Sequence, residues 1–131
     1  MGYQSVREDV MANIVANDFS KPDEKMTFDK AEANIVNLGD VKVTKAFLQP
    51  GWSWSTCIKP VVGTESCQAK HVGVVIQGSV SAKHDDGTEV QFKAGDAYVI
   101  EPGHDGWVEG NEVAVIYEFS GNTPWNVASS T

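Results

Sequence analysis

Short apolar runs dominate the chain after Ala33, and polar turns separate them at intervals of about 8–12 residues. Val, Ile and Thr are frequent within the runs, and Gly, Pro and Asp are frequent between them. This punctuation predicts many short β-strands, as in an all-β sandwich or small barrel. The predicted strands are 33–38, 42–49, 53–59, 68–76, 79–84, 89–92, 97–100, 106–108 and 113–119.

The N-terminus follows a helical pattern instead. Ser5 and Glu8 have the spacing of a capping box, and apolar residues recur at helical intervals from Val6 to Val15. We therefore predict a short amphipathic helix that ends near Asn17. The predicted organisation is an N-terminal helix and arm at 1–32, a barrel at 33–120 and a polar C-terminal tail at 121–131.

The charge and hydropathy of the chain limit the classes of partner that it can bind. Ten Lys and Arg against eighteen Asp and Glu give a net charge of -8, and no basic run is present to neutralise phosphates, so nucleic acid is not expected. No window approaches the roughly 18 apolar residues of a membrane span, and charged residues interrupt the N-terminus where a secretion signal needs an apolar run. We expect a cytoplasmic, single-domain protein without a membrane partner.

Two of the three histidines lie at edges of predicted strands that glycine turns bring back toward each other. Imidazole is both a metal ligand and a general base near neutral pH, so His71 and His104 are the first candidates for chemistry. Strand alternation places Cys67 on the same face as His71, but about 13 Å away along a regular strand. Sharing one ion would need a bend or bulge, which Gly73 would allow. His84, beside an Asp-Asp-Gly turn, is expected to be solvent-exposed.

The two cysteines leave three states open. A hairpin turning near Val62 would place Cys57 opposite Cys67, where a disulfide would stabilise the fold by about 2–3 kcal/mol. A reducing cytoplasm opposes that bond and favours free thiols. In the third state, Cys67 is bound to a metal ion.

Aromatic residues are candidates for a pocket wall. Trp52 and Trp54 share a face of the predicted strand 53–59 and the residue before it, and Trp107 closely follows the second histidine. Large rings with one polar nitrogen suit a wall that grips a planar or apolar ligand. They suit a core or a dimer interface equally well, and the same two interpretations apply to Tyr98.

The segment from Cys67 to Trp107, which contains CQAKHVGVVIQG and GDAYVIEPGHDGW, resembles the single-domain bacterial cupins. Their first motif is G-x5-H-x-H-x3-E-x6-G, and its last glycine fits Gly78. This alignment puts Glu65 and Cys67 in the two histidine positions and His71 in the glutamate position.

The second cupin motif, G-x5-P-x-G-x2-H-x3-N, matches at Gly95 and Gly103. Glu101 replaces its proline, Gly106 replaces its histidine, and His104 stands two residues earlier. A cupin subgroup whose second motif reads PPGHDAW is similar in this segment.

The resemblance implies an all-β cupin fold, a double-stranded β-helix or jelly-roll barrel, with a site in the barrel mouth. Two imidazoles and a carboxylate suit one divalent ion such as Zn, Fe, Mn or Ni, whereas a thiolate favours Zn or Cu. The candidate metal ligands are His71, His104, Cys67, Glu65 and Glu101. The candidate ligand pocket is formed by Trp52, Trp54, Tyr98 and Trp107.

Three functions stay open for such a barrel: two involve a small-molecule ligand, and in the third the barrel only scaffolds a homodimer. In a metal-dependent enzyme, an ion between His71 and His104 would polarise a carbonyl or activate oxygen or water, with Glu101 or Glu65 as base. In a noncatalytic binding or sensing protein, the histidines would line a pocket without metal. A homodimer is also expected, because valines and isoleucines on the strand face opposite His71 suit a sheet-on-sheet interface.

Overall fold

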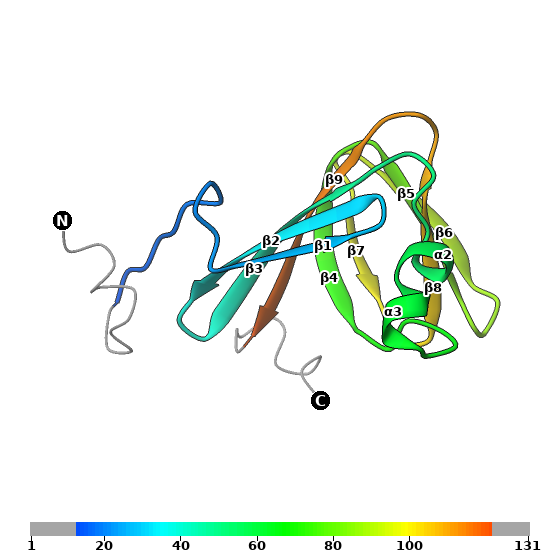
Figure 1. Ribbon diagram of the computed structural model, residues 1–131, viewed down its shortest axis with the longest axis horizontal. Coiled ribbons are helices and arrows are strands. Elements are labelled where there is room, and N and C mark those ends of the chain that lie inside the picture. Colours follow the sequence, from blue (N-terminus) through cyan, green and yellow to red (C-terminus); the bar gives the residue numbers. More distant parts are fainter. Residues whose placement is uncertain (1–12, 122–131) are drawn as a thin grey trace.

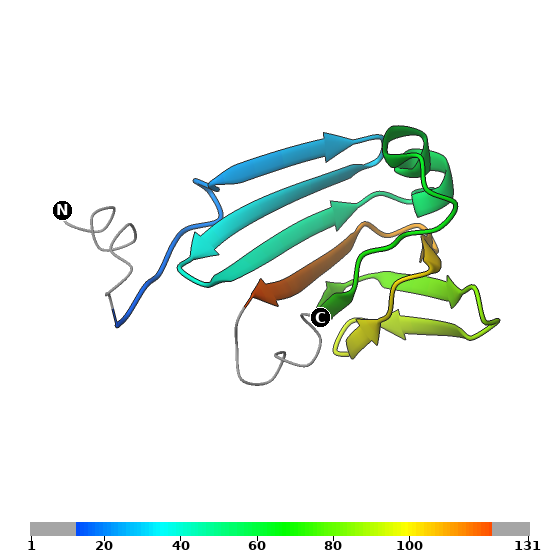
Figure 2. The same ribbon diagram turned by 90° about the horizontal axis from the view of Figure 1, so that it is seen from below.

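The computed structural model describes residues 13–121 of the 131-residue chain. These residues form two antiparallel β-sheets and two short helices (Figure 1). Figure 2 shows β1, β2, β3 and β9 side by side in one layer, with the helices at the end where β1 turns into β2. The sheet order of the large sheet is β1 (Glu24–Phe28), β2 (Ala31–Leu38), β3 (Val41–Leu48), β9 (Ala114–Gly121), β4 (His71–Gln77) and β7 (Ala97–Ile100). The order of the small sheet is β6 (Glu89–Lys93), β5 (Ser79–His84) and β8 (His104–Glu109).

The core lies between the two sheets, and both contribute to it. Apolar side chains at every second strand position point inward, as the pleat of a strand requires. Phe92 of β6 stacks on Tyr98 of β7 with ring centroids 4.7 Å apart, so this aromatic pair joins the small sheet to the large one. The buried core cluster consists of Ala46, Leu48, Val75, Val80, Ala82, Phe92, Val108, Ala114 and Ile116.

The predicted all-β architecture is confirmed, and β5 and β7 have the predicted bounds. Strand β1 was missed. It pairs with β2 at the edge of the large sheet, and all its residues but Phe28 are exposed. Met26 and Phe28 alternate with polar residues, but two apolar positions in a five-residue edge strand are too few for periodicity to indicate a strand.

The predicted strand 53–59 is wrong, because helices α2 (Trp54–Cys57) and α3 (Lys59–Val62) occupy this segment. The Oγ of Ser53 accepts a hydrogen bond from the backbone N–H of Thr56 and thereby caps α2. Pro60 lies in the first turn of α3, and Gly63 ends it in the left-handed conformation. The hairpin predicted near Val62 is therefore absent. Both cysteines are free thiols.

Most of the predicted N-terminal helix lies outside the described residues. The part of it that is described, residues 13–17, forms no helix. Phe19 packs against Tyr117 of β9, with ring centroids 5.5 Å apart, and so fixes this arm on the outer face of the large sheet.

No helix within residues 13–121 is long and apolar enough to cross a membrane. The face opposite His71 exposes Ile76 and Val99, at 52% and 59%. Homodimer formation through this face stays a prediction, which light scattering would test.

Candidate metal centre and cavity

Three side chains from different parts of the chain converge inside the barrel. Cys67, His71 and His104 each offer one ligand atom, and these atoms all lie within 4.8 Å of one another. His71 begins β4 in the large sheet, and His104 begins β8 in the small sheet. The ring centroids of the two histidines are 5.1 Å apart in an edge-on arrangement. The predicted convergence of the two histidines is therefore present, with a thiol as the third group.

An irregular segment brings Cys67 to the histidines. Residues 68–70 belong to no strand, so Cys67 and His71 are not separated by the length of an extended strand. Their Sγ and Nε2 atoms lie 3.6 Å apart. Cys67 also forms an isolated antiparallel bridge with His104, whose carbonyl oxygen accepts a 2.7 Å hydrogen bond from the N–H of Cys67. Backbone pairing thus sets two of the three side chains next to each other.

Hydrogen bonds fix which nitrogen each histidine presents. The Nδ1 of His104 lies 2.8 Å from the carbonyl oxygen of Glu101, and the Nδ1 of His71 lies 2.7 Å from the carboxylate of Glu118. Because oxygen acceptors hold both Nδ1–H groups, Nε2 is the nitrogen of each ring that remains for a ligand. In metal sites, the ring nitrogen of a histidine that does not bind the ion usually donates to an oxygen, which orients the imidazole.

Glu118 is itself held in place from the other side. Tyr98 donates a 2.7 Å hydrogen bond to its second carboxylate oxygen. Gly73 of β4 lies between them, opposite both Tyr98 and Glu118 in the sheet register. A Cβ at Gly73 would lie 2.8 Å from the Tyr98 hydroxyl, so a glycine at this position leaves the phenol room to reach the carboxylate.

The pKa values follow this network. Burial lowers the pKa of His71, but hydrogen bonds to Cys67 and Glu118 outweigh it and raise the value to about 10. Burial raises the pKa of Cys67, but hydrogen bonding with His104 and His71 outweighs it and brings the value down to about 6. Burial and the charge of Glu118 raise the pKa of Tyr98. At neutral pH the ion-free group is therefore a thiolate beside an imidazolium.

The three donors line a cavity of about 270 Å³ between the sheets. Trp52 and Trp54 line it as well, although they lie on a turn and a helix rather than on one strand face. The indole N–H of Trp52 is buried and has no acceptor within residues 13–121. The apolar part of the lining is formed by Phe28, Ala31, Ala33, Ala46, Leu48, Trp52, Trp54, Ile58, Val80, Ala82, Phe92, Ile100 and Ile116.

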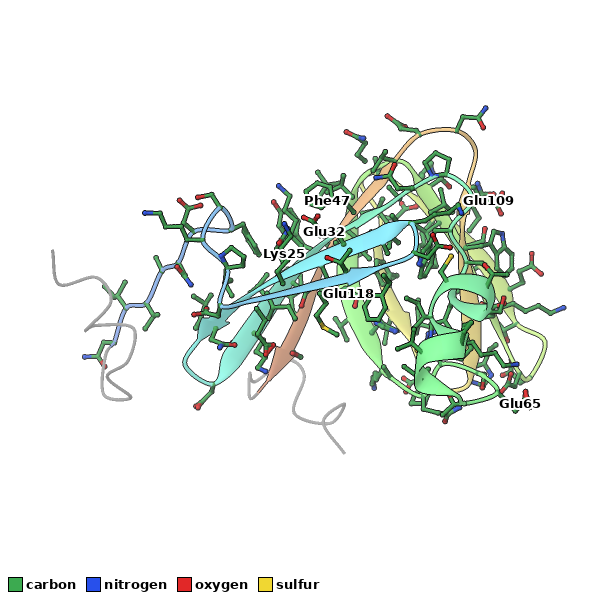
Figure 3. All side chains as sticks on the ribbon, in the orientation of Figure 1. Lys25, Glu32, Phe47, Glu65, Glu109 and Glu118 are labelled. Atoms are coloured by element: carbon green, nitrogen blue, oxygen red, sulfur yellow. The ribbon has the colours of Figure 1, made fainter. Side chains whose placement is uncertain are left out.

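Several candidate residues lie elsewhere. Glu65 is exposed and pairs with Lys59, 2.9 Å away (Figure 3). The carboxylate of Glu101 pairs with Lys70, and only its backbone oxygen contacts the site. These two carboxylates are not in the group of three donors.

Two further residues take other roles. Trp107 is not among the cavity-lining residues, and its indole N–H donates to Glu109. His84 is partly exposed, and its Nε2 lies 2.8 Å from the carbonyl oxygen of Pro102.

Sequence reasoning missed Glu118, although its strand was predicted. Alternation along that strand puts Glu118 on the same face as Ala114 and Ile116, which are both buried. A carboxylate on a core-facing position needs a partner, because burial of an unpaired charge is costly. That rule would have marked Glu118 as a candidate and directed attention to a histidine or tyrosine nearby.

The donor set fits a divalent metal ion. One thiolate and two imidazole nitrogens are ligands that zinc prefers, and three protein ligands with one open position are characteristic of catalytic zinc sites. Cys67, His71 and His104 would hold the ion. His71 would have to lose its Nε2 proton and keep the Nδ1 proton that faces Glu118.

Replacing Glu118 tests the hydrogen bond behind His71. We expect Glu118→Gln to weaken zinc binding by about 10- to 100-fold, because the charged acceptor that orients the imidazole is lost. A competition titration against a chromophoric chelator measures this affinity. Glu109→Gln is the matched control, since Glu109 likewise accepts two side-chain hydrogen bonds, from Trp107 and Ser81, but lies away from the three donors. Equal affinities of the two variants would contradict the assigned role of Glu118.

The low pKa of Cys67 predicts the pH dependence of its alkylation in ion-free protein. The reaction needs the thiolate, so the iodoacetamide rate should rise as pH increases through about 6 and level off above it. In His71→Gln the midpoint should move to higher pH, because a hydrogen bond that stabilises the thiolate is lost. Peptide mass spectrometry separates Cys67 from Cys57, which is 5% exposed and should react slowly. A midpoint that stays in place in His71→Gln would contradict the arrangement.

Comparison with solved structures supports the barrel assignment. A protein of unknown function from Rhizobium leguminosarum aligns with a TM-score of 0.54 and 20% identity, over 72% of this chain and 83% of that one. KdgF from Halomonas sp. aligns with a TM-score of 0.53 and 18% identity, over 79% and 91%. A cupin-like protein from Thermotoga maritima aligns with a TM-score of 0.53 and 16% identity, over 80% and 81%. At these identities the similarity shows the fold alone.

The sequence itself gives the family. Comparison with curated proteins finds no match. Residues 41–116, by contrast, match the family described as the EutQ-like cupin domain. This range runs from β3 into β9 and contains Cys67, His71 and His104. The chain therefore belongs to the cupins, in the family of EutQ-like cupin domains.

Proposed function

We propose that this chain is a metal-dependent cupin that binds a small organic molecule inside the barrel, next to one divalent ion. The observation that supports the proposal most directly is the group of Cys67, His71 and His104, with its three donor atoms within 4.8 Å of one another. Zinc is the ion that this donor set favours. When bound, such an ion supplies Lewis-acid chemistry toward a carbonyl or a water molecule.

The residues around the donors have separate tasks in this proposal. Glu118 holds the Nδ1 proton of His71, and Tyr98 keeps Glu118 in position through its second oxygen. The carbonyl oxygen of Glu101 does the same for His104, which is 4% exposed. The apolar lining would displace water from the part of the ligand that it covers, and this strengthens the electrostatic interactions at the donors.

A noncatalytic binding protein is the second candidate, and one observation favours it. The carboxylates of Glu65 and Glu101, which the sequence suggested as bases, pair with lysines away from the three donors, and both oxygens of Glu118 have hydrogen-bond partners. Within residues 13–121, no unpartnered carboxylate faces the donors to take up a proton. Turnover of a cavity ligand by the ion-loaded protein would argue against this second candidate.

Metal content is the direct test of the proposal. We expect untagged protein purified without chelator to hold one zinc ion per chain, and cobalt substitution to give an absorption band from the thiolate–cobalt bond. Cys67→Ser should lose that band, whereas Cys57→Ser should keep it, because Cys57 lies in α2 and contacts Asp29 instead. Elemental analysis and absorption spectroscopy provide the two measurements. Absence of a stoichiometric ion, also after addition of zinc or cobalt, would overturn the proposal.

A further inference from the structure

The side chains that line the cavity restrict the chemical class of the ligand. Apolar side chains from both sheets form most of the lining, and within residues 13–121 no lysine or arginine belongs to it. Charged groups of a ligand need a partner of opposite charge when they leave water. Away from the three donors, the part of the lining that the structure describes therefore offers no cationic side chain for a second anionic group of the ligand.

The two carboxylates in the lining are already engaged. Glu118 is hydrogen-bonded to His71 and Tyr98. Glu32 accepts a hydrogen bond from Asn34, and its Oε1 lies 3.7 Å from the Nζ of Lys25. A cationic ligand would therefore have to compete for both. The lining thus disfavours extra charge of either sign on the part of the ligand away from the three donors.

Size and shape point to one ring. An apolar cavity of about 150 Å³ already accepts benzene, so 270 Å³ holds a ring with a short substituent. Aromatic side chains from separate elements line the space, among them Phe28 of β1, Trp52 and Phe92 of β6. Flat apolar faces of this kind stack well on another ring.

We propose that the ligand is a small aromatic molecule with a single donor group, whose donor faces Cys67, His71 and His104 and whose uncharged ring lies among the apolar lining residues. Only one part of this inference rests on the proposed function, namely that the donor group of the ligand faces a metal ion. The preference for an uncharged aromatic body follows from the lining and applies to the ion-free protein as well. Phosphorylated compounds, dicarboxylates and short aliphatic acids are excluded as good ligands.

Three carboxylate probes test this class in zinc-loaded protein. Benzoate has one charge and a ring, phthalate adds a second charge, and acetate lacks the ring. We expect benzoate to bind at least about tenfold more tightly than either of the others, as measured by calorimetry or ligand-observed NMR. Acetate buries no ring, and phthalate buries its ring together with a second, unpaired charge. Equal or tighter binding of acetate or phthalate would overturn the proposed class.

A cavity-filling variant and a measurement on ion-free protein distinguish the proposed ligand class from the proposed metal-dependent function. Ala31→Leu fills part of the cavity and should abolish benzoate binding while zinc stays bound, whereas Ala97→Leu, an exposed position on β7, should change neither. In ion-free protein, the neutral probe benzyl alcohol should still raise the unfolding temperature of wild type but not of Ala31→Leu. Zinc binding without this discrimination would refute the ligand class alone. Stabilisation of ion-free wild type, but not of Ala31→Leu, by benzyl alcohol in a protein that binds no zinc would refute the metal-dependent function alone.

Discussion

Replacing His104 by alanine is expected to lower zinc affinity by at least about 100-fold. Loss of a residue that binds the ion directly should matter more than loss of a group that only orients such a residue, which typically costs about 10- to 100-fold. His104 is 4% exposed, so neither solvent nor a neighbouring side chain can easily replace its nitrogen. Competition with a chromophoric chelator, together with elemental analysis, measures the effect.

His84→Ala is the control for this experiment. His84 lies opposite His104 in the register of β5 and β8, but its Nε2 faces the carbonyl oxygen of Pro102. The His84→Ala variant should therefore retain the zinc affinity of wild type. His104→Gln, with thermal unfolding recorded for every variant, separates loss of the ligand from loss of the fold. Retention of stoichiometric zinc by folded His104→Ala would remove His104 from the site.

Gly73→Ala is expected to cause the largest loss of stability among single substitutions near the site. A Cβ at this position would overlap the carbonyl oxygen of Tyr117 and approach the Tyr98 hydroxyl to 2.8 Å. The first contact is with backbone in the middle of the large sheet, which cannot move without disturbing the pairing of β4 with β9. Overpacking of this kind costs about 1–3 kcal/mol and occasionally more, and we expect the upper end of that range in urea unfolding.

Gly106→Ala provides a matched comparison. Gly106 also lines the cavity and also lacks a positive φ angle, but the nearest atom to its added Cβ is the carbonyl oxygen of Ser81 at 3.4 Å. Its unfolding free energy should stay within about 1 kcal/mol of wild type, as for a substitution with ordinary contacts. If both variants were equally stable, the close packing around Gly73 would not restrict the side chain there.

The fold was largely predictable because its signals are local. Val, Ile and Thr runs separated by glycine turns specify strands wherever one face is buried, and the two cupin-like motifs gave the barrel. The strand predicted at residues 53–59 was wrong for an equally local reason. The general rhythm of short runs and turns was extended across this segment, whereas the capping Ser53 and the adjacent Pro60 favour helices, and such short helices leave little periodicity to detect.

The site was predictable in part. His71 and His104 were identified because histidines are rare in this chain and lie at strand edges. The distance from Cys67 to His71 was misjudged, since a regular strand was assumed across residues that form an irregular connection. Glu118 escaped notice because its contact with His71 spans 47 residues of sequence. Pairing of this kind depends on sheet order, which no single segment encodes.

The three donors come from both layers of the barrel, and this has a thermodynamic consequence. His71 starts a strand of the large sheet, His104 starts a strand of the small sheet, and Cys67 precedes β4 and bridges to His104 through its backbone. An ion held by all three acts as a cross-link between the layers at this end. Since binding to the native state alone adds to the free energy of unfolding, metal supply would set what fraction of the protein is folded.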